Sequence, residues 1–137
     1  SIGYIELSYA LANKLPRAEL KNRAGKFIAP SIEGTSAAAA GVTLPADYRV
    51  SIVNAEGDAT YPIASFTYLL VHRDAPSCAK AGPLVRLLWW LYHDPSAAKT
   101  ATELHYAPLP QRAVTSIEQT LQSLKCEGRV ILPAGDR

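Results

Sequence analysis

The spacing of apolar residues predicts a helix over residues 110–125 more clearly than any other element. Its apolar side chains recur at steps of three or four, which places them on one helix face. They are Val114, Ile117, Leu121 and Leu124. Pro110 suits the first turn, because an N–H group there has no partner within the helix. Two further helices are expected over residues 77–93 and 96–106, on either side of a break at Pro95.

Short extended runs alternate with helices at the start of the chain. Residues 2–6 have the alternation of a strand, and residues 7–15 then have the pattern of a helix that Pro16 ends. Residues 18–22 and 26–29 are predicted to pair as a hairpin. The beginning of the chain is therefore a strand and a helix followed by a hairpin.

The middle of the chain adds one helix and the strongest predicted strand. Ser31 is the expected N-cap of an alanine-rich helix that runs to Ala40, and Gly41 is placed to end it. Residues 43–60 have the turn residues of a connection, with one strand-like stretch inside it. Residues 63–72 are rich in β-branched and aromatic side chains, as in a strand buried on both faces. This mixture of elements predicts an α/β fold.

The longest apolar run, residues 84–92, is predicted to be a buried helix. Arg86 interrupts it, and it is far shorter than the ~20 residues that a membrane helix needs. No positively charged start leads into an apolar segment, so no signal peptide or membrane anchor is predicted within this sequence. The tail, residues 130–137, is expected to be irregular.

The charge balance argues against nucleic acid as a partner. The 137 residues carry 14 basic and 12 acidic side chains, and 48% of them are hydrophobic, which is ample for a core. The densest basic group mixes with apolar residues and has no interleaved aromatics, so it predicts a solvated face. It comprises Lys14, Arg17, Lys21, Arg23 and Lys26.

The opening sequence SIGYIELSYA suggests that the chain is part of a longer protein. It has the pattern of a strand already under way, with no capping turn ahead of it. Methionine is absent from the whole sequence. We therefore expect that further residues precede Ser1 in the natural protein.

No residue pattern predicts an active site. His72, His93 and His105 lack the spacings of a metal site, so no metal is expected. Ser96 and Lys99 match the S-x-x-K pattern of penicillin-recognising acyl enzymes, but the companion S-D-N and K-T-G elements are absent. A serine directly after a proline is better explained as a helix N-cap. The sequence therefore predicts no enzyme and no cofactor.

Two smaller features leave alternatives open. Gly34, Thr35 and Ser36 lie at the start of the alanine-rich helix, where free N–H groups could hold an anion, although ordinary capping is the simpler interpretation. Cys78 and Cys126 are too few and too far apart for a zinc site, so they are either bonded or free. A bond between them would indicate an oxidising compartment.

Several stretches together resemble one protein family. They are IGYIELSYALANKLPRAELKNRAGKFIAPS, the alanine-rich helix, YPIASFTYLLVHRD and LLWWLYHDPSAAKTATELHYAPLP. In this order and at these separations, over residues 1–125, they resemble the C-terminal part of the periplasmic phosphate-binding proteins of ABC transporters, the PstS family. The most specific strings begin at Tyr61, Leu88 and Tyr106.

The resemblance implies a type II periplasmic-binding-protein fold, in which two lobes close over one phosphate ion without catalysis. It assigns residues 1–60 to the remainder of the second lobe and residues 61–137 to the C-terminal part of the first lobe, with three helices. The implied partners are inorganic phosphate and the permease of an ABC transporter, and the implied location is periplasmic or extracellular.

The resemblance also implies what this chain lacks. The family holds phosphate through residues of its first half, and none of those motifs occurs here, so no phosphate ligand is expected among residues 1–137 and none is assigned to Gly34, Thr35 or Ser36. Some extracellular relatives carry cysteines where Cys78 and Cys126 fall, which implies a disulfide. The alternative is a secreted, non-enzymatic interaction module that keeps the fold without binding the ion.

Overall fold

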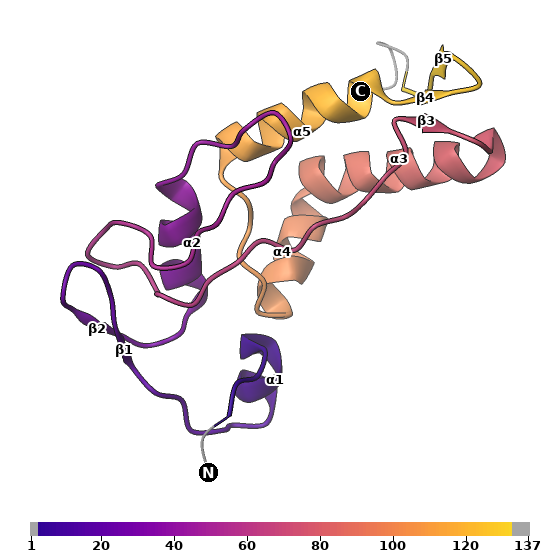
Figure 1. The fold of residues 1–137 in the computed structure, drawn as a ribbon. Helices are drawn as coiled ribbons and strands as arrows, with labels where there is room; N and C mark the ends of the chain where they lie inside the picture. Colours follow the sequence, from indigo (N-terminus) through magenta and orange to yellow (C-terminus); the bar gives the residue numbers. More distant parts are fainter. Residues whose placement is uncertain (1–2, 133–137) are drawn as a thin grey trace. The chain divides into compact units, whose positions relative to one another are not determined.

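The computed structural model describes residues 3–132, whose helices and short strands belong to two compact units (Figure 1). One unit contains residues 3–67 and 100–110, and the other contains residues 68–99 and 111–132. The chain therefore changes unit after residues 67, 99 and 110. The mixture of helices and strands agrees with the predicted α/β class at this coarse level.

The first unit opens with helix α1, Leu7–Ala12. The helix stops earlier than predicted, because Asn13 is its C-cap and Lys14 takes a left-handed conformation with φ 52°. Glu6, at the N-cap position, accepts a hydrogen bond of 2.5 Å from the hydroxyl of Tyr106. This bond connects the beginning of the chain to the segment 100–110 within the same unit.

A short hairpin follows α1, as the sequence predicts. Strands β1, Leu20–Lys21, and β2, Phe27–Ile28, pair antiparallel, with Leu20 opposite Ile28. Gly25 has φ 80° in the turn, a conformation that glycine adopts without steric cost.

Asn22 lies at the end of β1 and is 5% exposed. Its side-chain nitrogen donates to the carbonyl oxygens of Gly57, Asp58 and Thr60, at 3.2, 3.0 and 3.2 Å. Its side-chain oxygen accepts from the N–H of Lys26 at 3.0 Å. One buried amide thus joins the hairpin to the loop 57–60, and its polar atoms are satisfied.

Helix α2, Ile32–Ala40, begins and ends where the sequence predicts. The Ser31 hydroxyl oxygen accepts from the N–H of Gly34 at 3.0 Å, and Gly41 is the C-cap. A small core lies against the helix and consists of Ala38, Ala39, Ile52 and Ala64. The alanine side chains let the following loop approach the helix closely, so the apolar residues of this unit are buried without a sheet.

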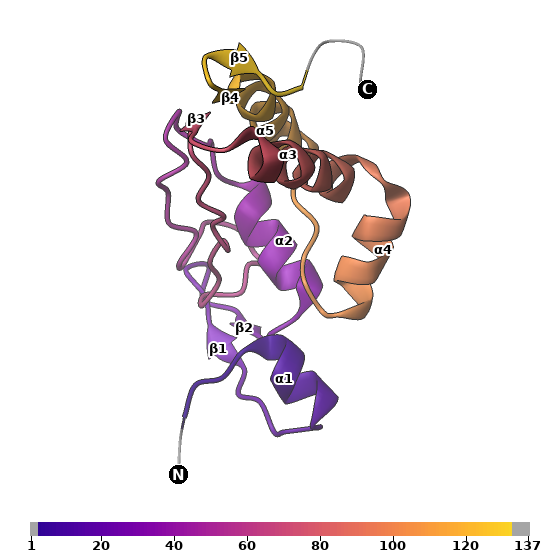
Figure 2. The same cartoon turned by 90° about the vertical axis from the view of Figure 1, so that its right-hand side faces the viewer.

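The second unit contains α3, Cys78–His93, and α5, Gln111–Ser123, which lie side by side in both views (Figures 1 and 2). Helix α4, Pro95–Glu103, follows α3 and crosses the boundary between the units. The three helices predicted for this half of the sequence are confirmed.

The core of the second unit lies between α3 and α5. Its buried members come from both helices and from the chain after α5, and they are Val85, Leu88, Leu121, Leu124 and Leu132. Ile117 packs against this core and Val114 is 9% exposed, so the predicted apolar face of α5 is buried. Burial of these side chains stabilises the helix pair by the hydrophobic effect.

A three-stranded sheet covers one end of this unit. Strand β3, Asp74–Ala75, pairs parallel with β4, Lys125–Cys126, which pairs antiparallel with β5, Arg129–Val130. Of the tail predicted to be irregular, residues 130–137, only Val130 lies in this β4–β5 hairpin; residues 131–132 are in no helix or strand, and residues 133–137 lie outside the described part of the chain.

Two predicted strands are wrong in the described structure. Residues 3–6 and 63–72 contain no strand, and no strand ladder among the described residues includes them. The strand-like stretch near residue 50 is also irregular. A strand needs a neighbour for its backbone N–H and C=O groups, and the described residues supply none at these positions.

Helix α3 is half-exposed, so the prediction of a buried helix over residues 84–92 is wrong. Val85 and Leu88 face the core, whereas Leu87 is 56% exposed and Trp90 is 44% exposed. Periodicity predicted the helix correctly, but it could not show which of the apolar faces has a partner. Among the described residues, no helix is long and apolar enough to cross a membrane.

Candidate functional site

The polar residues at the start of α2 are used in capping. The Gly34 N–H donates to the Ser31 hydroxyl, and the Thr35 hydroxyl donates to the Ser31 carbonyl oxygen at 3.0 Å. A β-carbon on Gly34 would lie 3.1 Å from Cβ of Tyr61, so this turn is tightly packed. These contacts favour the capping interpretation of the Gly34-Thr35-Ser36 stretch.

Ser96 lies inside the first turn of α4, so the prediction that it is the N-cap is wrong, and Asp94 occupies that position. The hydroxyl and the N–H of Ser96 both donate to one carboxylate oxygen of Asp94, at 2.5 and 2.8 Å. These bonds favour the charged carboxylate and hold the pKa of Asp94 below its ordinary value. The Asp94 side chain therefore caps the start of α4, and the Ser96 hydroxyl donates its proton to the capping carboxylate.

His93 makes contacts that stabilise the α3–α5 pair. Its Nδ1 lies 2.7 Å from the carbonyl oxygen of Trp89, and its Nε2 lies 2.8 Å from a carboxylate oxygen of Glu118 on α5. A carbonyl oxygen only accepts, so Nδ1 carries the proton. These contacts explain His93 as a structural residue.

The described residues contain one group with the spacing of metal ligands, and its two sulfur atoms are already bonded to each other. This group is Cys78, Cys126 and Glu127. A disulfide offers no thiolate to a cation, so this group does not predict a metal centre.

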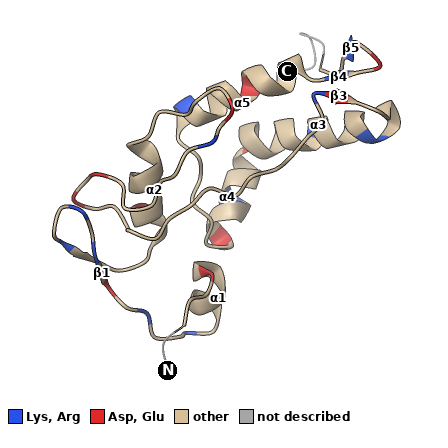
Figure 3. Cartoon of the chain, viewed as in Figure 1, with Lys and Arg blue, Asp and Glu red and all other residues tan. Residues whose placement is uncertain are grey.

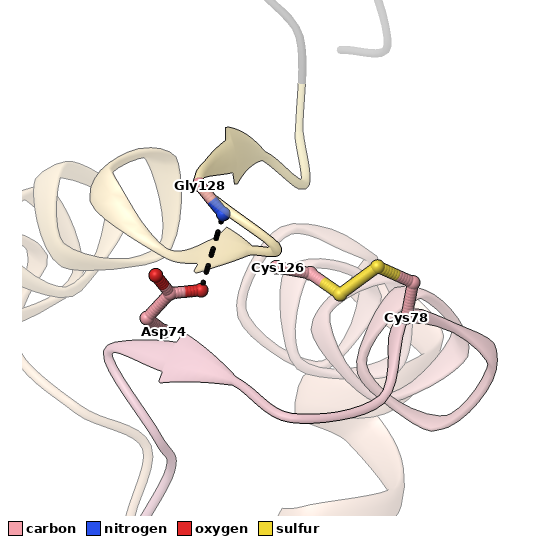
Figure 4. Close-up of a disulfide and its surroundings, with 4 residues drawn as sticks. All are labelled: Asp74, Cys78, Cys126 and Gly128. Atoms are coloured by element: carbon pink, nitrogen blue, oxygen red, sulfur yellow. Dashed lines mark hydrogen bonds between the residues drawn. A yellow bond between two sulfur atoms is a disulfide. The ribbon is translucent and has the colours of Figure 1, made fainter.

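The disulfide expected from the resemblance is present between Cys78 and Cys126 (Figure 4). Their Cα atoms are 5.4 Å apart, and the cysteines are 48 positions apart in the sequence. Cys78 is the exposed first residue of α3, whereas Cys126 is buried in β4. The Gly128 N–H lies 3.5 Å from a carboxylate oxygen of Asp74 beside the bond. The bond therefore attaches the C-terminal hairpin to the beginning of α3.

The basic residues of the first unit do not form a single strong patch (Figure 3). Arg23 lies 3.2 Å from a carboxylate oxygen of Glu56, and Lys26 lies 2.5 Å from one of Asp58. All four side chains are mostly exposed, so each pair contributes about 0–1 kcal/mol. Arg23 and Lys26, two members of the predicted basic group, thus each have an exposed acidic partner.

Comparison with known proteins identifies relatives that match most of the chain. It is 37% identical over 120 residues to the phosphate-binding protein PstS of Xylella fastidiosa strain 9a5c, a match that covers 86% of this chain and 32% of the relative. PstS of Pasteurella multocida strain Pm70 is 36% identical over 122 residues, or 86% of this chain and 34% of the relative. This chain is a relative of PstS. The resemblance found in the sequence is thereby confirmed, although no protein-family model matches.

A third PstS comparison covers a shorter stretch. PstS of Methanocaldococcus jannaschii is 42% identical over 79 residues, which is 52% of this chain and 20% of that protein. The chain spans about a third of the length of the first two PstS proteins. The names of these relatives state phosphate binding.

Proposed function

We propose that this chain is the C-terminal segment of a type II periplasmic phosphate-binding protein that supplies an ABC transporter permease. The observation that carries the proposal is the match to PstS proteins over 86% of the chain but only 32–34% of their length. The segment would build parts of both lobes and perform no chemistry. The Cys78–Cys126 disulfide supports a periplasmic or extracellular location.

The phosphate ligands would lie in the part of the longer protein outside residues 1–137. A desolvated phosphate needs several convergent N–H and O–H donors and an arginine. The donors at the start of α2 are occupied by Ser31, and Arg23 is paired with Glu56. These contacts support the assignment of the ligands to the other part of the protein.

The two compact units support an assignment to two lobes. We assign residues 1–60 to the second lobe and residues 61–137 to the first lobe, with a crossing near residues 59–62. The unit boundaries lie after residues 67, 99 and 110. In this assignment, the segment 100–110 leaves the second unit, packs with the first unit and returns, so it is an additional connection between the two. Residues 63–72 would then be a strand of a sheet whose other strands come from the longer protein.

Calorimetric titration with inorganic phosphate tests the location of the ligands. The 137-residue chain is expected to give no tight binding, whereas the longer protein that contains it should bind one ion. One-to-one micromolar binding by the isolated chain would contradict the assignment. Absence of binding by the longer protein as well would instead contradict the proposed function.

A second candidate is a secreted interaction module that keeps the fold without binding the ion. Each unit has a hydrophobic core of its own, and this observation favours a chain that folds by itself. The mass of the purified natural protein distinguishes the two hypotheses. A monodisperse lone chain supports the interaction module. A covalently attached or co-purifying N-terminal part supports the phosphate-binding protein.

A further inference from the structure

One face of α3 carries an arginine and both tryptophans of the chain. Trp89 and Trp90 are each three or four positions from both Arg86 and His93, so the four side chains lie on the same side of the helix. With three neighbours they line a surface pocket of about 500 Å³ within the second unit. These neighbours are Asp94, Pro95 and Leu132.

A polar neighbour holds the Trp89 side chain of this pocket. The ring of Trp89 stacks on that of His93, with centroids 4.0 Å apart and an interplanar angle of 18°. His93 is itself held by Glu118 at 2.8 Å. Asp94, which also lines the pocket, is held by the Ser96 hydroxyl. The Trp89 ring is therefore fixed before any ligand arrives, which reduces the entropy cost of binding.

Arg86 provides the positive charge of the pocket. Its side chain is exposed and makes no hydrogen bond or ion pair with another described residue. A guanidinium group binds a carboxylate through two parallel hydrogen bonds. Asp94 follows eight positions later, about 12 Å along the helix axis at 1.5 Å per residue. The pocket is thus positive at one end and negative at the other, which fixes the direction of an anionic ligand.

We propose that this pocket binds a small aromatic carboxylate. The flat apolar group would lie against Trp89 and Trp90, and the carboxylate would pair with Arg86, away from Asp94. The volume is within the usual range for small-molecule sites, and aromatic walls with a few polar groups are typical of them. Inorganic phosphate has no apolar part, so this site is separate from the proposed phosphate function and does not depend on it.

The two tryptophans make the site directly observable. Both line the pocket, and the chain contains no others, so the indole N–H signals in a proton–nitrogen NMR spectrum report on this site alone. Phenylacetate is expected to shift these signals in a saturable manner. Phenylacetamide has the same ring without the charge, and acetate has the charge without the ring. Each is therefore expected to bind with an affinity at least about tenfold lower than that of phenylacetate.

Substitution of the arginine completes the test. Arg86→Gln is expected to weaken phenylacetate binding about tenfold, because the charge-assisted hydrogen bonds are lost. Arg112→Gln, at an exposed arginine of α5 outside the pocket, is the matched control and should bind like the parent chain. Equal affinity of parent and Arg86→Gln, equal affinity for phenylacetate and phenylacetamide, or no saturable shift in the folded chain would each overturn the proposal.

Discussion

Asn22 joins the β1–β2 hairpin to the loop 57–60 through three side-chain hydrogen bonds, and it accepts a fourth from Lys26 within the hairpin. We expect Asn22→Ala to lower the free energy of unfolding by about 2–3 kcal/mol, because buried backbone groups lose their partner. Asn13→Ala is the matched control: this exposed side chain bonds only to the Tyr9 carbonyl, and its loss should cost less than about 0.5 kcal/mol. Urea unfolding followed by circular dichroism measures both, and equal effects would contradict the role of Asn22.

Tyr106 and Glu6 form a second residue-level connection in this unit. The hydrogen bond to the Glu6 carboxylate raises the pKa of the Tyr106 phenol above its ordinary value, with the negative charge of Glu6 adding to the effect. A raised pKa in the folded state means that the contribution to stability is present below about pH 10 and is lost as the pH rises through the folded value.

The difference in alkaline phenolate absorbance between the parent chain and Tyr106→Phe isolates this group from the other tyrosines. This difference is expected to titrate above pH 10, because the ordinary pKa of a tyrosine phenol is about 10 and that of Tyr106 is raised. In a Glu6→Gln background the same difference should move toward the ordinary value. Titration of Tyr106 at or below the ordinary value in the parent chain would show that the bond to Glu6 does not form in solution.

At the scale of elements, the disulfide fixes the C-terminal hairpin to α3. We expect Cys78→Ser, a change at the exposed partner, to lower the free energy of unfolding by about 2–4 kcal/mol, because the unfolded chain gains the freedom of an open loop. Reductant should destabilise the parent chain similarly and leave Cys78→Ser unchanged. An unfolding midpoint that is the same with and without reductant would contradict this contribution.

The extended segment 63–72 gives a second prediction at this scale. Leu69 is 57% exposed and Leu70 is 96% exposed, although the segment has the composition of a buried strand. If the longer protein supplies the neighbouring strands, backbone amides of residues 63–72 should exchange with deuterium rapidly in this chain and slowly in the longer protein. Rapid exchange in both proteins would contradict the proposed sheet.

Local signals predicted the helices well, and long-range pairing decided where the prediction failed. The Ser31 cap and the apolar face of α5 depend on residues within a few positions, so the sequence contains them in full. The strands predicted at residues 3–6 and 63–72 depend on neighbours that the described residues do not supply.

The sequence does not predict the pocket around Arg86, because the apolar run of residues 84–92 has the composition of a buried helix. The spacing of Arg86, Trp89 and Trp90 was the available signal for it.

At the scale of the whole molecule, the chain resembles PstS proteins over 86% of its own length and about a third of theirs. Its structure has two units with separate cores, and its described polar clusters are used in caps, ion pairs and a disulfide. Both observations support a scaffold that builds parts of two lobes, while the ion is held by residues elsewhere in the protein.

The most direct test of this central claim is a crystal structure of the longer natural protein with phosphate bound. We expect every side chain and N–H group in contact with the ion to come from outside residues 1–137, and residues 63–72 to pair in a sheet with strands from that other part. A phosphate ion coordinated by residues of the present chain, such as Thr35 or Ser36, would contradict it.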